Sequence, residues 1–307
     1  MKRKLALVLA GILAFGLVAC GSSSSSSTEE TTEEAAEEEE TTEEAAEEEE
    51  TEEAAEETTE LDFSESAYLS DGVLTVGLNA TFPPFEYVGD GTDTFDAITV
   101  NEGGVTGFDV AMMNEIGLRL GVDIEIENME FDGIVAAIGV KVDCAATGMT
   151  ITEERKEAVA FSDPYYNATQ AVLLPIDSEI ASAEELEGLT IGVQSGTTGQ
   201  VVAEGIEGAE ISSVKSFNQA VLDLVNGKVD AVVIDEVPGE AFVSTYPDDI
   251  KLVEGSVFEF EVEQYGIAMP QDDEILIEAI NGALADMVED GTYDELIEEY
   301  ISNYEAE

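Results

Sequence analysis

"FDGIVAAIGVKVDCAATG", from Phe131 to Gly148, and "FNQAVLDLVNGKVDAVVID", from Phe217 to Asp235, carry the same pattern in two parts of the chain. With a gap of one residue, each has a leading phenylalanine, a helix-like stretch, "KVD" and a strand-like stretch of small or apolar residues. A match this short also arises by chance, but each copy lies within its own series of strand and helix patterns. We therefore expect two similar lobes, each with a helix-to-strand unit.

Short apolar runs alternate with helical patterns on both sides of Ala171. Before it come "VLTVGL", "DVAMMNEIGLRLG" and "VDIEIEN", and after it come "LTIGVQ", "GTTGQVVAEG" and "PGEAFVSTY". Strands that alternate with helices predict parallel-rich sheets covered by helices, which is an α/β fold. The final stretch, "DEILIEAINGALADMVEDGTYDELIEEYISNY", predicts two amphipathic helices interrupted at "DGTY".

The N-terminus has the features of a secretory signal. Lys2, Arg3 and Lys4 precede an apolar run from Leu5 to Ala19 that is short for a membrane span, so residues 1–19 are expected to be a signal peptide. "LVAC", ending at Cys20, resembles the lipobox of bacterial lipoproteins. We expect Cys20 to carry lipid and to become the mature N-terminus, and the alternative is an ordinary signal peptide with a chance cysteine.

Residues 20–60 are expected to form a disordered tether. Positions 29–60 repeat "TTEEAAEEEE" and hold 19 glutamates with no apolar residue larger than alanine, so they have nothing from which to build a core. Positions 61–307 hold 52 acidic and 7 basic residues, a net charge of −45, which disfavours nucleic acid as a partner. The other cysteine, Cys144, lies in "VDCAATG" and is expected in the core.

Arg155 is one of the few basic residues of the chain, and the motif around it suggests a binding role. "TITE" has the S/T-x-x-E spacing of a capping box, which predicts a helix that starts at Thr150 and carries Arg155 early on. A guanidinium beside free backbone N–H groups suits a clamp on a carboxylate, whereas for Arg155 alone a surface ion pair is the simpler reading. "SGTTG", residues 195–199, offers a second helix start for the carboxylate, and Asp235 offers an anion for an ammonium group. Together they predict a site for an amino-acid zwitterion.

Six motifs, in order along the chain, carry a family resemblance. They are "ATFPPFEY", "GFDVAMMNEI", "GMTITEERKEAVAFSDPYY", "VQSGTTG", "KVDAVVIDE" and "QYGIAMP". From Val73 to Tyr300 the chain resembles the polar amino-acid solute-binding proteins of ABC importers. The resemblance implies a two-lobed periplasmic-binding-protein-like fold of type II, with two hinge strands near 167–170 and 263–266. Residues 61–169 and 265–307 would form lobe 1, and residues 170–264 would form lobe 2.

The resemblance also implies roles for individual residues. Arg155 is expected to clamp the ligand carboxylate with the backbone of Thr150 and Thr198, and Asp235 to bind the ammonium with the Gly148 carbonyl or a neighbouring threonine. Phe82 and Phe131 would sandwich the ligand side chain, whereas Phe85 and Phe95 are expected in the core. The expected ligand-binding set is Asn79, Phe82, Phe131, Thr147, Gly148, Thr150, Arg155, Gln194, Thr197, Thr198 and Asp235.

Two departures from the family pattern bear on specificity. Where several relatives, especially those for basic amino acids, have an aspartate, this chain has Asn79, and where the glutamine binder has a lysine it has Gln194. Two uncharged amides predict a neutral polar ligand such as glutamine, with cystine or another neutral amino acid as the next choice. Asp90, Asp93 and Asp96 do not match a calcium-loop pattern, so we expect an acidic, solvated loop and no metal or cofactor.

The mechanism that these features predict is capture by hinge closure followed by delivery to an ABC permease with its ATPase. The chain has no histidine and no nucleophile beside a base, and each acid in the matched motifs is expected to bind or cap, so we expect no enzyme activity. The alternatives are a cyclohexadienyl-dehydratase-like enzyme on the same fold and a sensory ligand-binding module. We expect a monomer held by its lipid at the extracellular face of the cytoplasmic membrane, or in the periplasm where an outer membrane exists.

Overall fold

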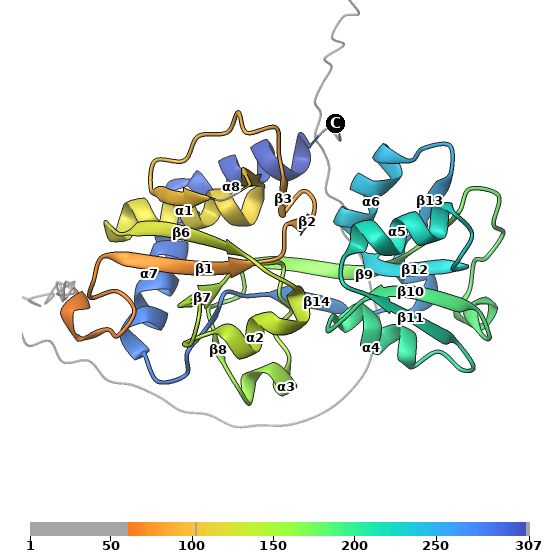
Figure 1. Cartoon of the computed structure of the whole chain (residues 1–307), viewed down its shortest axis with the longest axis horizontal. Helices are drawn as coiled ribbons and strands as arrows, with labels where there is room; N and C mark the ends of the chain where they lie inside the picture. Colours follow the sequence, from red (N-terminus) through yellow and green to blue (C-terminus); the bar gives the residue numbers. More distant parts are fainter. Residues whose placement is uncertain (1–60, 102, 305–307) are drawn as a thin grey trace, which may run out of the picture. The chain divides into compact units, whose positions relative to one another are not determined.

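The computed structural model describes residues 61–101 and 103–304, and the predicted signal peptide, Cys20 and tether lie outside the described residues. Two mixed sheets, each covered by helices, form the fold (Figure 1). The expected alternation of strands and helices is therefore present on both sides of Ala171. Within the part of the chain that the structure describes, no helix is both long enough and apolar enough to cross a membrane.

The first sheet has the strand order β4-β6-β1-β7-β15-β8. Its strands are β1 (Val73–Leu78), β4 (Ile98–Asn101), β6 (Asp123–Asn128), β7 (Cys144–Ala145), β8 (Ala160–Phe161) and β15 (Ala268–Met269). β1 runs parallel to β6 and β7, while β15 pairs antiparallel with β7 and β8. The helices of this part are α1 (Phe108–Leu120), α2 (Ile134–Ala137), α3 (Glu153–Lys156), α7 (Glu274–Asp290) and α8 (Thr292–Leu296), and a π-helical turn (Ile297–Ser302) continues α8.

The second sheet has the order β11-β10-β12-β9-β13. Its strands are β9 (Tyr166–Pro175), β10 (Thr190–Gln194), β11 (Glu210–Val214), β12 (Ala231–Asp235) and β13 (Ile250–Val253). β10 runs parallel to β11 and β12, whereas β9 is antiparallel to β12 and β13. The helices of this part are α4 (Thr198–Glu204), α5 (Phe217–Val225) and α6 (Glu236–Thr245), with 3-10 turns at Ala183–Leu186 and Gly255–Phe258. Two further 3-10 turns, Phe63–Glu65 and Phe131–Gly133, lie in the part of the chain that forms the first sheet.

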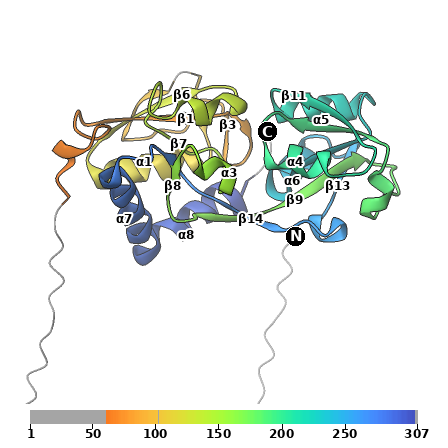
Figure 2. The same ribbon diagram turned by 90° about the horizontal axis from the view of Figure 1, so that it is seen from below.

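β9 and β14 (Val262–Tyr265) lie side by side between the two sheets (Figures 1 and 2). Tyr166 to Thr169 pair with β14, and from Gln170 onward the same strand pairs with β12. The chain therefore leaves the first sheet after β8, enters the second sheet along β9, and returns along β14 to β15 of the first sheet. These are the positions at which the family resemblance implies hinge strands.

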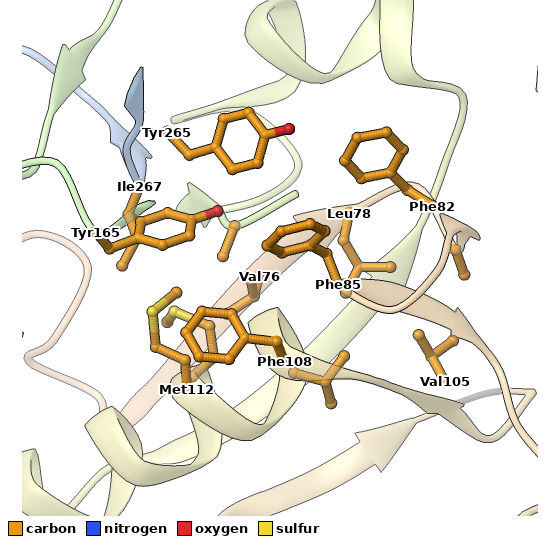
Figure 3. Packing of buried hydrophobic residues seen from close by; sticks show 14 of the residues in the cluster. Val76, Leu78, Phe82, Phe85, Val105, Phe108, Met112, Tyr165, Tyr265 and Ile267 are labelled. Carbon is orange, nitrogen blue, oxygen red and sulfur yellow. The ribbon is translucent and has the colours of Figure 1, made fainter. Parts of the chain in front are cut away.

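Aromatic rings fill the space where β9 and β14 meet the first sheet (Figure 3). The Phe85 ring lies 5.4 Å from that of Tyr265 and 6.1 Å from that of Phe108, both edge to face. Phe85 is fully buried and Phe95 packs on the same core cluster, as expected for both. A short three-stranded sheet, β2 (Thr81–Phe82), β3 (Glu86–Val88) and β5 (Val105–Thr106), holds the chain around Phe85.

The two repeated units of the sequence both form a helix followed by a strand, but their helices differ. In the first unit a 3-10 turn precedes α2, which has 4 residues, whereas α5 of the second unit has 9. Gly139, with φ of 73°, turns the backbone soon after α2 into a left-handed conformation that glycine adopts readily. Cys144 is fully buried on β7, as predicted.

Candidate ligand-binding site

One cavity collects all eleven residues that the sequence predicts as ligand-binding. It encloses about 320 Å³ including its open mouth, and Glu86 and Phe217 complete its lining. The predicted residues on its wall are Asn79, Phe82, Phe131, Thr147, Gly148, Thr150, Arg155, Gln194, Thr197, Thr198 and Asp235.

The cavity lies at the carboxyl ends of four strands. Asn79 follows β1, Thr147 follows β7, Gln194 ends β10 and Asp235 ends β12. Because β1 is parallel to β7, and β10 to β12, the ends of each pair meet at one edge of its sheet. Strand topology thus brings Asn79 to Thr147 and Gln194 to Asp235, and one cavity collects both pairs.

Arg155 lies early in α3, although the helix begins later than the sequence predicts. Thr152, not Thr150, is the N-cap, and its side chain accepts from the Arg155 backbone N–H at 3.2 Å. The backbone of Thr150 and Ile151 instead pairs with β14, through the Thr150–Tyr265 bridge and the bond from Ile151 N–H to the Gln264 carbonyl, so the residues that would follow a cap at Thr150 stay outside the helix. The capping box that "TITE" predicts at Thr150 is therefore wrong by two residues.

The Arg155 guanidinium binds two carbonyl oxygens from different parts of the fold. Nη1 donates to the Thr150 carbonyl at 2.6 Å, and Nη2 donates to the Gly196 carbonyl at 3.0 Å. The group also lies 5.5 Å from the centre of the Phe131 ring, and burial lowers its pKa. Among the described residues Arg155 makes no ion pair, whereas five other basic residues do. The surface ion pair considered as an alternative for Arg155 is therefore not what the structure shows.

Asp235 lines the same cavity as Arg155 but has different hydrogen-bond partners. Its Oδ1 accepts from Gln170 Nε2 at 3.0 Å. Although Asp235 precedes α6, its side chain makes no capping bond to that helix. Burial raises the pKa of Asp235 to about 7, and the charge of Glu263 adds to the shift. An ammonium group in the cavity would favour the ionised form.

Thr197 and Thr198 begin α4, as the "SGTTG" motif predicts. The Thr197 hydroxyl accepts from Gln200 N–H at 3.2 Å and donates to the Gln194 carbonyl at 2.8 Å. The first backbone N–H groups of a helix have no partner inside the helix, and since Thr197 already holds that of Gln200, those of Thr198 and Gly199 are the ones available to an acceptor in the cavity.

Asn79 and Gln194, the two predicted side-chain readers, contact each other. Gln194 Nε2 donates to Asn79 Oδ1 at 2.8 Å and to the Lys215 carbonyl at 3.1 Å. Asn79 Nδ2 donates to the Met129 carbonyl at 2.6 Å. Both amides are buried, and their mutual bond joins the first sheet to the second.

Phe217 is an aromatic residue that lines the cavity and was not predicted from the sequence. Its ring stacks on that of Phe82 at 5.5 Å with an angle of 29° between the planes. Phe217 occupies the same place in its repeated unit as Phe131 does in the other, and both line the cavity. The repeat was therefore the signal that could have identified it.

Glu86 is the second missed residue, and its environment is unusual. It is 1% exposed, and its Oε1 accepts from the Thr147 hydroxyl at 2.6 Å. Beside it Asp109 accepts from Gly148 N–H at 2.7 Å and from the Tyr165 hydroxyl at 2.9 Å. Burial raises the pKa of Glu86 well above its usual range and that of Asp109 to about 7. Glu86 Oε2 and Asp109 Oδ1 are buried with no hydrogen-bond partner among the described residues.

Glu86 also corrects one expectation from the sequence. The acids in the family motifs were all expected to bind or to cap, yet Glu86 in "ATFPPFEY" is a cavity carboxyl of raised pKa. No signal in the motif itself shows this, because the shift comes from burial against Asp109, 23 residues away in the chain.

The fold is that of a two-lobed α/β binding protein, and the candidate ligand cavity is lined by residues from both sheet groups. The chain belongs to the bacterial extracellular solute-binding proteins, family 3, whose family model matches residues 74–303. Proteins of this family bind solutes for transporters and are not enzymes, so the predictions of family, fold class and absence of enzyme activity are confirmed.

The similar proteins bind different amino acids, as their names state. A probable histidine-binding protein of Campylobacter jejuni is 32% identical over 235 residues, which cover 74% of this chain and 84% of that protein. A mutant of ArgBP from T. maritima is 41% identical with a TM-score of 0.68, covering 76% of this chain and 97% of that one. An ancestral arginine-binding protein bound to glutamine is 39% identical with a TM-score of 0.64, covering 75% and 97%.

Proposed function

We propose that this chain captures an amino acid between its two lobes and delivers it to an ABC permease with its ATPase. The observation that carries the proposal is the arrangement of Arg155 and Asp235 in one cavity, with the Arg155 charge not paired to any described carboxylate. The cation suits the ligand carboxylate, together with the free N–H groups at the start of α4, and the anion suits the ammonium. A zwitterion satisfies both ends at once.

Capture requires the cleft to open and close, and β9 and β14 are the strands about which it would hinge. Several bonds join the two lobes across the cavity and would break on opening. They are those from Gln194 to Asn79, from Arg155 to Gly196 and from Lys215 to Asp132, the last at 2.6 Å. The lobe boundaries of the sequence analysis, 61–169 with 265–307 and 170–264, fall on these two strands and are part of this proposal.

For the ligand we propose a neutral polar amino acid such as glutamine. The amides of Asn79 and Gln194 can each donate and accept, so they can exchange their mutual bond for bonds to a carboxamide. The similar ancestral protein, solved with glutamine bound, supports the choice.

A second candidate is a cationic amino acid such as arginine, and Glu86 is the observation that favours it. Its Oε2 is buried with no hydrogen-bond partner among the described residues, and burial raises the pKa of Glu86 so that its carboxyl group favours a proton. A guanidinium in the cavity could replace that proton, and arginine-binding proteins are among the similar structures. The two candidates differ in protons, because arginine would release one on binding and glutamine would release none from Glu86.

Isothermal titration calorimetry with L-glutamine, L-arginine, L-histidine and L-cystine tests the ligand. We expect glutamine to bind with little change in Glu86→Gln, which keeps the shape but removes the charge. Binding of arginine without glutamine, lost in Glu86→Gln, would establish the second candidate. If none of the four bound, the proposed amino-acid ligands would be wrong.

The remaining parts of the proposal concern anchoring and partners. We propose a lipid at Cys20 and a monomer that is tethered outside the cell, which mass spectrometry and analytical ultracentrifugation would test. Copurification with a permease would support transport, whereas copurification with a kinase would support the sensory alternative.

A further inference from the structure

Glu263 lies on β14, opposite Ala168 of β9, and its side chain is half-buried. It does not line the ligand cavity. It lines a neighbouring groove of about 1340 Å³, which Arg155, Thr197 and Thr198 also border. Glu263 therefore lies outside the ligand cavity but next to residues that line it, on a strand between the two sheet groups.

One oxygen of Glu263 holds a threonine from each side of the cleft. Oε2 accepts from the Thr150 hydroxyl at 2.7 Å and from the Thr198 hydroxyl at 2.7 Å. The two hydroxyl oxygens are 3.4 Å apart. Thr150 lies between β7 and α3, beside the first sheet, whereas Thr198 begins α4, over the second sheet. These bonds exist together only while the two sides of the cleft are in contact.

The hydrogen bonds also decide what the threonines can offer to a ligand. A threonine hydroxyl has one hydrogen to donate and two lone pairs to accept with. Because Thr150 and Thr198 both donate to Glu263, their hydroxyl oxygens can only accept from a group in the cavity. Such acceptors suit an ammonium, and the ligand carboxylate is left to Arg155 and to backbone N–H groups.

We propose that Glu263 is a positioning residue of the ligand site, which holds Thr150 and Thr198 together in the closed cleft and slows the release of the bound amino acid. The inference rests on the proposed function, since it concerns the same cavity. Glu263 touches no ligand itself and acts through the two threonines. The negative charge of Glu263 also raises the pKa of both Arg155 and Asp235, so it favours the protonated form of each group.

Stopped-flow dissociation of L-glutamine and of L-arginine tests the kinetic part. In Glu263→Ala we expect dissociation about tenfold faster with association unchanged, since hydrogen bonds to a charged group are lost only from the closed form. Glu263→Gln keeps an oxygen that accepts from both hydroxyls, so it should restore most of the slow release. Glu261→Ala is the matched control: Glu261 is an exposed glutamate on the same segment, and its removal should leave the rate unchanged.

Proton NMR tests the threonine bonds without depending on which amino acid binds. Hydroxyl protons held by Glu263 should exchange slowly and give resolved signals, assigned by their loss in Thr150→Val and Thr198→Val. Both signals should vanish in Glu263→Ala and persist in Glu261→Ala. Should Glu263→Ala not fold, Glu263→Gln and Thr198→Val still report the two bonds.

Three results would overturn the inference: signals that persist in Glu263→Ala, signals absent from the wild type with and without amino acid, or dissociation equally slow in both Glu263 variants. Failure of the wild type to bind either amino acid would count against the proposed ligands instead, because the NMR signals would still decide whether Glu263 holds the threonines.

Discussion

At Arg155, carbonyl oxygens rather than carboxylates accept the guanidinium hydrogens. In a chain with 71 acidic and 10 basic residues, a basic side chain meets an acidic one almost anywhere on the surface. Arg155 avoids this because its neighbours Thr150 and Gly196 present backbone oxygens and because Phe131 covers its face. Neutral partners leave the full positive charge available to a carboxylate in the cavity.

Arg155→Ala should weaken amino-acid binding at least about 100-fold, since two charge-assisted hydrogen bonds to the ligand carboxylate are lost. A thermal-shift screen followed by calorimetry with L-glutamine and L-arginine measures this. Lys156→Ala is the control, because Lys156 is the next residue and forms an exposed ion pair with Glu153 at 2.9 Å. Unchanged binding in Arg155→Ala would show that the clamp assignment is wrong.

The raised pKa of Asp235 predicts that the stability of the fold depends on pH. Its pKa in the fold is about 7, as is that of Asp109, and burial is the main cause for both. Between about pH 4, the ordinary value for aspartate, and pH 7 the folded chain therefore holds more protons than the unfolded chain. The stability that these groups contribute is complete at low pH and is lost as the pH rises toward 7.

We accordingly expect the melting temperature without amino acid to be lower at pH 8 than at pH 5. Asp235→Asn should reduce that difference by at least about 2 °C, which corresponds to about 1 kcal/mol in a domain of this size. The exposed Asp248, replaced by asparagine, is the matched control. An equal pH dependence in the two variants would contradict the prediction. A bound ammonium should also release a proton from Asp235 below pH 7, which calorimetry in buffers of different ionisation enthalpy detects.

At the scale of elements, the packing of one 3-10 turn against β9 is tight. Gly255 begins the turn Gly255–Phe258, and a Cβ atom at this position would lie 1.8 Å from the Gln170 carbonyl oxygen of β9. Gln170 in turn binds Asp235 through its side chain. The turn therefore supports the strand that supports the site.

Gly255→Ala should destabilise the fold by about 1–3 kcal/mol, because the backbone of β9 or of the turn must move. Chemical denaturation gives the free energy of unfolding, and binding of L-glutamine or L-arginine should weaken as Gln170 shifts. Gly282→Ala is the control, since Gly282 lies exposed in α7 with nothing within 4 Å of an added Cβ. That change should be neutral or should stabilise by up to about 1 kcal/mol, as alanine favours a helix. Equal stabilities of the two variants would argue against close contact at Gly255.

For the whole molecule, charge is the dominant feature. The net charge of −61 leaves most carboxylates without a basic partner, so repulsion opposes the compact state. At about 1 M salt the screening length falls to about 3 Å, against about 10 Å at 0.1 M.

The melting temperature should therefore rise between 0.1 and 1 M sodium chloride, by about 5 °C or more if screening recovers about 2 kcal/mol. Potassium chloride should act equally, because screening depends on ionic strength. Sucrose, which carries no charge, serves as the control for general solute effects. A flat or falling melting temperature in both salts would contradict the prediction.

Local pattern was sufficient for much of this molecule. Strand and helix alternation predicts the two α/β groups, and "SGTTG" predicts the start of α4 at Thr197 and Thr198, because periodicity and capping depend on residues a few positions apart. The family motifs also led to eleven residues that meet in one cavity, with Arg155 and Asp235 among them.

Tertiary contacts decided the rest. Thr152 rather than Thr150 caps α3 because the backbone at Thr150 pairs with Tyr265 of β14, and the pKa of Glu86 is raised because the fold buries it, with Asp109 adding to the shift. Gln194 meets Asn79, and Glu263 meets Thr198, only where the two sheets approach. Composition and local spacing determine which elements form. Burial, the pKa shifts that it causes and the partner of each hydrogen bond depend on which distant residues meet in space, and the fold as a whole sets that.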